Sequence, residues 1–349
     1  MDYNGEKKQR RERYKGTHPK QFKDKYKELQ ADKYIADVEK IISQGKTPAG
    51  SHRSICVNEI LEILKIAPGE TGLDATLGYG GHCLEMLFCL NKTGMLYAID
   101  VDPIELTKTR KRIEELGYGN ENIIIKKLNF SDIDQISVET EYLNFILADL
   151  GVSSMQIDNP ERGFSIKHDG PLDLRLNPTT GKSASAFLRT VTQDRLEELL
   201  QYNSDEPYAK KIAIAVCSKI AKGLQIETTS QLKQCINEAL FFLPSHDRAE
   251  NCKKAHQRCF QALRIEVNRE FEVLEKFLEK IPTVLSSGGR VAIITFHSGE
   301  DRLVKKSFQY YLRKGTYKEI ADEPVRASVE EINSNPRARS AKIRWAIKA

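Results

Sequence analysis

A glycine-rich turn between a short apolar segment and a helical segment constrains this fold more than any other feature. The turn lies in residues 71–82, TGLDATLGYGGH, and the leucine-rich sequence LEMLFCL follows it. Its glycines, Gly78, Gly80 and Gly81, allow a sharp reversal and let bare backbone approach a ligand. The amides that open the following helix would then face an anionic group. The pattern predicts a strand, a ligand-binding turn and a helix.

A second apolar segment ends in an acid shortly after this turn. Residues 97–103 read YAIDVDP, which places Asp100 at the end of a strand. In dinucleotide-binding folds an acid about 20 residues beyond the glycine turn binds the ribose diol. NAD, FAD and S-adenosylmethionine all fit such a turn, and glycines that serve only a backbone turn would give the same pattern. Asp74 and Asp100, at the ends of two successive strands, favour a nucleotide-type cofactor.

Strand-like and helical segments alternate through the first half of the chain. Four strand candidates, GLDAT, MLYAID, NIIIKKL and NFILADL, are separated by helical patterns such as residues 103–116. A fifth strand is expected at residues 290–296, a helix at 301–312 and a last strand at 341–347. This alternation predicts an α/β fold whose parallel sheet is covered by helices on both faces.

The ends of the predicted strands mark the place where a ligand would bind. Ligands of open parallel sheets bind beyond the carboxyl ends of the strands. We therefore expect one crevice to collect the residues at these ends, namely residues 78–82, Asp100, Phe130, Asp149 and His297. Asp149 closes the fourth strand, where its carboxylate could accept hydrogen bonds from a substrate amine. A cap on the next turn is the alternative, and the ligand-like groups on the other strand ends favour the substrate.

The segment between the fourth and fifth strands is too long for one crossover connection. Residues 155–256 show mostly helical patterns, such as RLEELLQY and QLKQCINEALFFL, and predict a module inserted into the sheet domain. The sheet domain would then comprise residues 51–154 and 257–349, and residues 1–50 would form a separate N-terminal arm.

A long loop at residues 159–175 opens the predicted insert. It is charged and rich in glycine and proline, with little helical or strand periodicity. Loops of this kind either carry function or lack order. The side chains that suit base stacking and phosphate binding are Arg162, Phe164, Lys167 and Arg175.

The excess positive charge of the chain lies in its N-terminal arm. The whole chain has a formal net charge of +5, and residues 1–50 hold 13 Lys+Arg against 8 Asp+Glu, so the remainder is neutral. Such an arm either adds salt-sensitive affinity for nucleic acid or forms a solvated, partly helical tail. Its composition alone does not decide between these two interpretations.

Length and composition indicate a cytoplasmic protein with a sizeable core. With 349 residues and 40% hydrophobic content, the chain can form more than one domain. No apolar run reaches the ~20 residues of a membrane helix, and the mixed-charge N-terminus resembles neither a signal nor a transit peptide. Seven irregularly spaced cysteines indicate reduced thiols rather than a disulfide framework. We expect no membrane partner.

Two further motifs have both structural and functional interpretations. In FHSGEDR, Ser298 and Asp301 form an S-x-x-D capping box, while His297 is either a ligand contact or a satisfied polar group. Cys252, His256 and Cys259 have helical spacing that resembles a metal site. A CxxC pair and a fourth ligand at the usual spacing are missing, so we predict free thiols and no metal.

Several longer blocks, taken together, are typical of one enzyme family. In chain order they are DATLGYGGH, AIDVDP, DLGVSSMQIDNPERGFSIKHDGPLDLRLNP, FQALRIEVNRE, GGRVAIITFHSGEDRLVK and NPRARSAKIRWA. The chain thereby resembles the ribosomal RNA small subunit methyltransferase H family over about residues 52–349. The DLGVSS…PLDLR block is highly specific for it, and the basic arm lies outside the resemblance.

The resemblance implies an S-adenosylmethionine-dependent enzyme that methylates the exocyclic N4 of a cytosine in 16S rRNA, in the decoding centre of the small ribosomal subunit. It also implies a Rossmann-like class I methyltransferase sheet with an inserted helical domain for RNA recognition. The family's contacts to S-adenosyl-L-methionine match, residue by residue, Gly80, Gly81, His82, Asp100, Phe130, Asp149 and Gln156.

We expect Asp149, or the backbone carbonyls after it, to take the catalytic role. Cytosine N4 is a poor nucleophile, and an acceptor at this strand end would favour a pyramidal nitrogen in line with the methyl group. The residues expected to contact RNA bases and phosphates are Arg162, Phe164, Lys167, Arg175, Arg258, Arg264 and His297. The C-terminal Arg337, Arg339, Lys342 and Arg344 would add affinity for the RNA backbone.

The chain departs from the family pattern at three places. The family usually has leucine at the position of Gly299, P-A-T-R-T where this chain reads KAHQRC, and G-E-E where it has Asn203, Ser204, Asp205 and Glu206. These changes leave the cofactor residues intact and fall on the substrate side. A divergent paralogue that methylates another RNA cytosine is therefore one alternative.

Two other functions share parts of the pattern. An NAD-dependent oxidoreductase would share the glycine turn and Asp100, but the sequence supplies no catalytic group for it. A non-catalytic ribosome-assembly factor on the same fold would bind small subunits without consuming methyl donor, and the intact cofactor residues argue against it. The sequence leaves the oligomeric state open, with a homodimer as one option.

Overall fold

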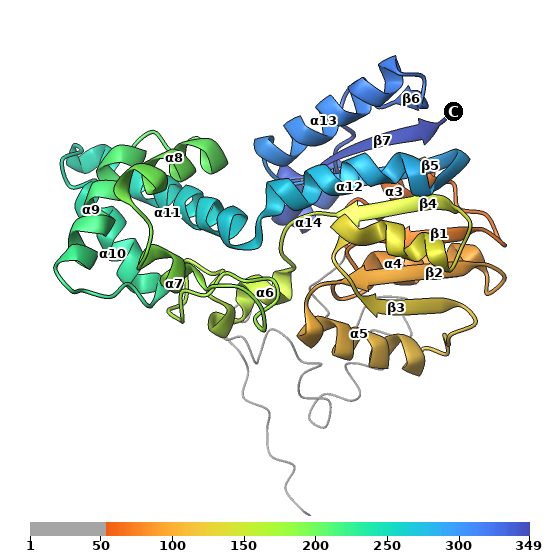
Figure 1. The fold of residues 1–349 in the computed structure, drawn as a ribbon, viewed down its shortest axis with the longest axis horizontal. Coiled ribbons are helices and arrows are strands. Elements are labelled where there is room, and N and C mark those ends of the chain that lie inside the picture. Colours follow the sequence, from red (N-terminus) through yellow and green to blue (C-terminus); the bar gives the residue numbers. More distant parts are fainter. Residues whose placement is uncertain (1–53) are drawn as a thin grey trace, which may run out of the picture. The chain divides into compact units, whose positions relative to one another are not determined.

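The computed structural model describes residues 54–349, and the N-terminal arm lies outside the described residues. Within the described part, a seven-stranded sheet has the order β3-β2-β1-β4-β5-β7-β6 (Figure 1). The strands are β1 (Thr71–Asp74), β2 (Met95–Asp100), β3 (Ile123–Lys127), β4 (Leu143–Asp149), β5 (Leu285–Thr295), β6 (Tyr317–Ile320) and β7 (Lys342–Lys348). β1 to β5 are parallel, and β7 pairs antiparallel with both β5 and β6.

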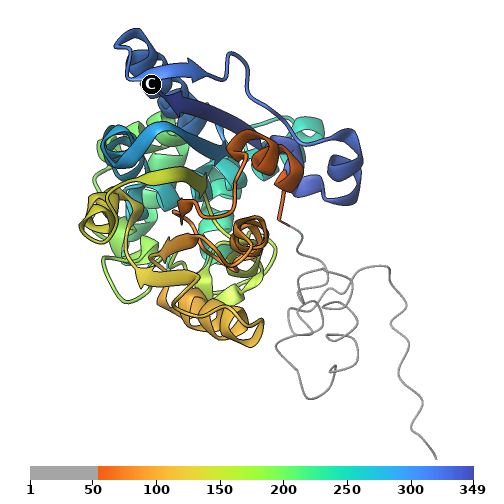
Figure 2. The ribbon, with the colours of Figure 1, turned by 90° about the vertical axis from the view of Figure 1, so that its right-hand side faces the viewer.

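Helices cover both faces of this sheet, as the alternating pattern predicts. One face packs against α3 (Val57–Leu64), α4 (Gly81–Leu90) and α5 (Pro103–Glu115), and the other against η2 (Phe130–Val138), α12 (Glu270–Val284) and α13 (Ser298–Arg313). Figure 2 shows α3 and α4, in red and orange, on the side of the sheet opposite to η2 and α12.

The strands supply two separate hydrophobic clusters because their side chains alternate between the faces. Leu96 and Leu147 belong to the first cluster, whereas their neighbours Tyr97 and Ala148 belong to the second. Strands buried on both faces must be apolar at nearly every position, which explains continuous runs such as LNFILAD.

The long segment between β4 and β5 is mostly helical. Its helices are α6 (Ser154–Asp158), α7 (Ala184–Leu188), α8 (Gln193–Ser204), α9 (Ala209–Ala221), α10 (Thr229–Ala239) and α11 (Ser245–Asn268). A third hydrophobic cluster, with buried members from Leu172 to Leu263, lies among them. α11 crosses position 256 without a break, so the predicted boundary of the insert falls inside a helix.

Two consecutive helices precede β5. α11 ends at Asn268 and α12 begins at Glu270, because Arg269 between them has a left-handed backbone with φ of 52°. The Asn268 side chain accepts a hydrogen bond from the backbone N–H of Leu176 at 2.7 Å and donates to the carbonyl of Leu174 at 2.8 Å. These long-range bonds hold the break, and a helical pattern does not reveal them.

Some shorter elements were not expected from the sequence. β6 has only four residues and forms the edge of the sheet, while α14 (Val329–Ser334) and η4 (Pro336–Ser340) precede β7. β6 has an exposed, charged centre at Lys318 and Glu319, so it lacks an apolar run. In the part of the chain from residue 54 onward, no helix is both long and apolar enough to cross a membrane.

Candidate active site

The glycine turn after β1 is fixed to the end of β2. The backbone N–H of Leu77 donates to the carbonyl of Ile99 at 2.9 Å, and that of Gly78 donates to Oδ2 of Asp100 at 2.7 Å. Gly80 has φ of 80° and caps α4, and a Cβ atom on Gly81 would overlap the hydroxyl of Ser54. Gly80 is therefore favoured by the turn itself, and Gly81 by its close contact with Ser54. Gly78 also has a positive φ, of 46°, although a Cβ there would meet only the Thr76 carbonyl at 3.8 Å.

Asp100 offers a carboxylate at the end of β2. Its Oδ2 accepts the bond from Gly78, and its Oδ1 accepts one from the backbone N–H of Asp102 at 2.9 Å. Burial raises the pKa of Asp100 to about 6. The group is thus ionised at neutral pH, and each carboxylate oxygen keeps a lone pair that could accept a ribose hydroxyl. Asp100 therefore fits the predicted cofactor role.

Asp102 is a central residue that sequence reasoning missed. It is completely buried, and its Oδ1 caps α5 by accepting the backbone N–H of Ile104 at 3.0 Å. Its Oδ2 accepts bonds from Nε2 of Gln156 at 2.8 Å and from Nη1 of Arg162 at 2.7 Å. The dipeptide Asp102-Pro103 is typical of a helix start and predicts the cap. Gln156 and Arg162, however, lie 54 and 60 residues away in the sequence, so only the fold reveals them as partners.

Gln156 lies in the first turn of α6, shortly after β4. Its Oε1 accepts the backbone N–H of Ser153 at 2.9 Å, which completes a capping box for α6, and its Nε2 donates to Asp102. The amide has one further N–H. The contact to S-adenosylmethionine that the resemblance implies for Gln156 remains a prediction, whereas its bridge between α6 and Asp102 is visible.

Asp149 ends β4 beside the glycine turn. Its backbone N–H donates to Oγ1 of Thr76 at 2.7 Å, and its Oδ2 lies 3.6 Å from Nδ1 of His82. Within the described part of the chain, the buried Oδ1 has no hydrogen-bond partner. The side chain is still 29% exposed, and burial raises its pKa. This under-solvated carboxylate can therefore accept a hydrogen bond from a group that enters at the strand end.

His82 and Asp74 surround Asp149. Nε2 of His82 lies 2.9 Å from the carbonyl of Ile55, so this nitrogen carries the proton and Nδ1 faces Asp149. Asp74 is buried and accepts the backbone N–H of Thr76 at 3.1 Å, and burial raises its pKa to about 7. The glycine turn thus collects two carboxyl groups with raised pKa and one histidine ring around the end of β4.

Phe130 lies at the third strand end that the sequence predicts for the crevice. It is the first residue of η2, and its half-buried ring packs on Phe277 with centroids 5.0 Å apart. The ends of β1, β2, β3 and β4 thus supply a glycine turn, two carboxylates and an aromatic ring. Their arrangement is that of a nucleotide-type cofactor site at the carboxyl edge of a parallel sheet.

A family model, the MraW methylase family, matches residues 49–349. The chain belongs to the MraW methylase family.

Its relatives cover nearly all of the chain. The "Ribosomal RNA small subunit methyltransferase H 2" of Alkaliphilus metalliredigens is 65% identical over 349 residues, the whole of both chains. The protein named H 1 from Lachnoclostridium phytofermentans is 60% identical over 97% of this chain and 93% of its own. A solved structure of a putative rRNA-methylase from Clostridium thermocellum matches 85% of this chain and 100% of its own, with 10% identity and a TM-score of 0.41.

Two of the loop residues expected to bind RNA, Arg162 and Arg175, instead form bonds within the protein. Arg162 is buried, and besides Asp102 its guanidinium donates to the carbonyls of Arg175 and Leu176 at 3.0 and 2.8 Å. Arg175 forms a two-bond pair with Asp173 at 2.7 and 2.6 Å. The expectation that Arg162 binds phosphate is therefore corrected, because its charge is already neutralised and enclosed.

The other two loop residues differ in exposure. Phe164 is half-buried and packs against the third hydrophobic cluster, with the Arg162 guanidinium 5.7 Å from its ring. Lys167 is exposed on the loop. The structure thus leaves Lys167 as the loop cation that is free to approach a phosphate.

Arg258 and Arg264 also have acidic partners. Nη1 of Arg258 lies 3.8 Å from Oε2 of the buried Glu206, and 38% of its side chain is exposed. Arg264 forms two bonds to Glu270 at 2.8 and 2.9 Å, and its side chain is only 15% exposed. Arg258 can still reach an RNA phosphate, whereas Arg264 mainly fixes the start of α12.

His297 caps α13, which corrects the predicted capping box. The box consists of His297 and Glu300, one residue earlier than the predicted pair. Ser298 lies in the first turn, and Asp301 instead accepts bonds from Nζ of Lys342 at 3.0 Å and Nε of Arg344 at 2.6 Å. The S-x-x-D match is therefore misleading, because the His297 ring accepts the hydrogen bond from the backbone N–H of Glu300.

The C-terminal cations are mostly paired, which also corrects an expectation. Arg344 is buried against Asp301, and Lys342 shares the same carboxylate. Arg337 pairs with Asp158 at 3.2 Å, while Arg339 is exposed. Arg344 and Lys342 therefore join β7 to α13, and of the four residues Arg339 is the one best placed for RNA.

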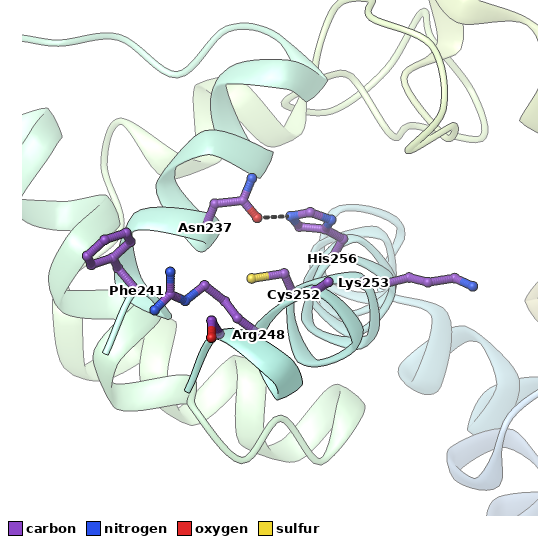
Figure 3. A pocket seen from close by; sticks show the side chains of 8 residues that line it. Asn237, Phe241, Arg248, Cys252, Lys253 and His256 are labelled. Carbon is purple, nitrogen blue, oxygen red and sulfur yellow. Dashed lines mark hydrogen bonds between the residues drawn. The ribbon is translucent and has the colours of Figure 1, made fainter. Parts of the chain in front are cut away.

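A hollow on the helical insert contains two members of the Cys–His pattern (Figure 3). Cys252 and His256 from α11 line it together with Asn237 and Phe241, and Nε2 of His256 lies 2.9 Å from Oδ1 of Asn237. Cys259 is fully buried in the third hydrophobic cluster. Figure 3 shows the imidazole directed at Asn237, and the Arg248 guanidinium lies 4.3 Å from the Phe241 ring.

Proposed function

We propose that this protein transfers the methyl group of S-adenosylmethionine to the exocyclic N4 of a cytosine in 16S rRNA of the small ribosomal subunit. The observation that carries the proposal is the under-solvated carboxylate of Asp149 at the end of β4, beside the glycine turn. Relatives up to 65% identical are named ribosomal RNA small subunit methyltransferase H, which supports the substrate class.

S-adenosylmethionine supplies an electrophilic methyl group bound to a sulfonium. Asp100 would hold its ribose, and the turn at Gly78 leaves open space for its approach. Phe130 and Gln156 would complete the cofactor site, as the resemblance implies. These residues fit the cofactor because they provide a charged acceptor, bare backbone and a ring at one edge of the sheet.

Asp149 would prepare the nucleophile. The lone pair of N4 is delocalised into the cytosine ring, so the amine reacts only when it is oriented and pyramidal. A hydrogen bond from N4 to the Asp149 carboxylate favours that geometry and stabilises the positive charge that develops on nitrogen as the N–C bond forms. No strong base is needed, because the N4 proton becomes acidic during transfer and can leave to the carboxylate or to water.

The helical insert would recognise the RNA. We assign this role to the module between β4 and β5. Within it, we expect Lys167, Arg258 and Phe164 to contact the RNA. Bases in RNA loops unstack at low cost, which lets a target cytosine enter the crevice. The ribosomal substrate also favours the cytoplasm as the place of action.

The decisive experiment is transfer of a labelled methyl group to small subunits from cells that lack this gene. Nucleoside analysis should give N4-methylcytidine at one decoding-centre position. Label on a different cytosine would support the divergent paralogue, which the three departures from the family pattern favour. Cofactor binding without label would support a non-catalytic assembly factor and contradict the proposal. Sedimentation of the same protein distinguishes a monomer from a homodimer.

A further inference from the structure

The three segments that depart from the family pattern are linked by a series of side-chain contacts. Asn203, at the end of α8, donates from Nδ2 to the carbonyl of Ala262 on α11 at 3.1 Å. Glu206, in the same replaced segment, lies 3.8 Å from Arg258, the one polar residue of KAHQRC that the family pattern also has. The third departure, Gly299 in the first turn of α13, faces the same region through Phe271.

Gly299 makes room for an aromatic side chain. A Cβ atom at Gly299 would lie 2.6 Å from Cζ of Phe271, so the usual leucine could not coexist with this ring in its position. Phe271 is in the first turn of α12 and contacts two other rings edge-on. The centroid of His297 is 5.9 Å from it on one side, and that of Tyr202 is 6.2 Å from it on the other. We call Tyr202, Phe271 and His297 the aromatic row.

The aromatic row extends from the residue that follows Phe296, just after β5, to an exposed ring on the insert. His297 follows β5 directly, and Ile294 of β5 pairs with Asp149 in the sheet. At the opposite end, Tyr202 on α8 is 66% exposed. Arg258, whose side chain is 38% exposed, lies 3.8 Å from the carboxylate of Glu206, just beyond the same end of α8.

We propose that the aromatic row is a stacking site for an RNA base that neighbours the target cytosine, with Tyr202 as the ring that contacts it. The inference rests on the proposed function and deepens it by naming a second nucleotide site. A nucleotide beside a flipped base loses one stacking partner, and an exposed ring held edge-on by Phe271 replaces that partner. Stacking on a ring tolerates any base, so the site would position the strand rather than read its sequence.

Tyr202→Ala tests the outer ring. We expect it to raise KM for small subunits roughly tenfold, as loss of one base–aromatic stack does, with unchanged kcat and unchanged Kd for S-adenosylmethionine. Tyr202→Phe keeps the ring and should stay within about twofold of the wild type. Phe88→Ala removes a ring that is 77% exposed on α4 and is the matched control, with no expected effect.

Gly299→Leu tests the departure itself. The leucine should displace the Phe271 ring, so that it no longer packs against Tyr202. KM for small subunits should then rise as it does in Tyr202→Ala. Because both changes remove the same stack, the double variant should be no worse than either single one. If Gly299→Leu does not fold, Phe271→Leu removes the ring without adding a clash.

The outcomes separate this inference from the proposed function. If the wild type methylates small subunits and Tyr202→Ala leaves KM unchanged, the stacking site is wrong and the function stands. If the wild type transfers no methyl group, binding of a 16S rRNA decoding-centre fragment replaces KM as the readout. Roughly tenfold weaker binding by Tyr202→Ala would then support the stacking site, and equal binding would overturn it.

Discussion

Within residues 54–349, the buried Oδ1 of Asp149 has no hydrogen-bond partner, although the side chain, at the end of a central strand, is 29% exposed. An unpaired buried carboxylate oxygen is costly in a folded protein, because burial removes water without replacing its hydrogen bonds. Such a group is expected where a ligand supplies the missing donor. Oγ1 of Thr76 accepts the backbone N–H of Asp149, and Nδ1 of His82 lies 3.6 Å from its Oδ2.

We predict that Asp149→Asn lowers kcat for methyl transfer about 100-fold or more, as loss of an electrostatic contact in a transition state typically does. The Kd for S-adenosylmethionine should change only a few-fold, because Asp100 and the glycine turn remain. Asp134→Asn alters an exposed acid on η2 and is the matched control. Full turnover by Asp149→Asn at saturating cofactor would exclude Asp149 from the chemistry.

Asp74 makes stability depend on pH. Its pKa is about 7 in the folded protein and 3.8 for an ordinary aspartate, so the folded state binds its proton more tightly than the unfolded state. The stability that this proton contributes is complete below about pH 4 and is lost as the pH rises through 7. Relative to Asp74→Asn, the wild type should therefore lose a few kcal/mol of unfolding free energy between pH 4 and pH 8. Urea unfolding of both proteins at several pH values measures this, and a constant difference would contradict it.

At the scale of elements, the buried Asp102–Arg162 pair ties the loop of residues 159–175 to the end of β2. Asp102 caps α5, Gln156 connects it to α6, and Arg162 carries the bonds onward to Arg175 and Leu176. The Asp102 carboxylate thereby connects the cofactor side of the sheet to the start of the insert. We infer that the loop is ordered by this network.

We predict that Arg162→Ala costs about 3–5 kcal/mol of unfolding free energy, because it leaves the Asp102 carboxylate buried without its cation. Arg175→Ala breaks a more exposed pair and should cost about 1 kcal/mol or less. Urea unfolding compares the two, and proteolysis should cut the loop faster in Arg162→Ala alone. Equal stabilities would show that Arg162 is not a structural anchor.

At the scale of the whole molecule, charge is distributed unevenly. Residues 1–50 hold all the excess positive charge, while many cations of the described part are paired with acids. Exposed cations of the described part include Lys167 on the loop, Lys182, Lys210, Lys211 and Lys222 on the insert, and Arg339 near the C-terminus. The arm, which holds the net excess of positive charge, is one source of long-range attraction for RNA that the sequence offers.

We predict that neutralising Lys7, Lys8 and Arg10 with glutamine weakens RNA binding at low salt and flattens its salt dependence. The slope of log K against log salt should fall by roughly 2, at about 0.7 for each lost contact to a single strand. The same change at the exposed Lys305 and Lys306 of α13 is the control. An unchanged slope would favour the solvated-tail interpretation of the arm.

The sequence alone predicts six of the seven strands, most of the helices that cover them and the cofactor edge, because each depends on local information, whereas the short edge strand β6 is missed. Apolar runs specify buried strands, glycines mark the turn, and Asp100 and Asp149 stand at strand ends where a parallel sheet collects ligands. The helical character of the insert is equally local. These features can be predicted without knowing which elements pack against each other.

Only the tertiary structure decides which charged residues remain free. Arg162, Arg264 and Arg344 look like RNA contacts in sequence, yet each lies against an acid from a distant or neighbouring element. The same holds for the break at Arg269 and for the aromatic row, whose members come from three separate helices or their caps. A side chain's partner depends on long-range packing, and the residue type alone does not carry that information.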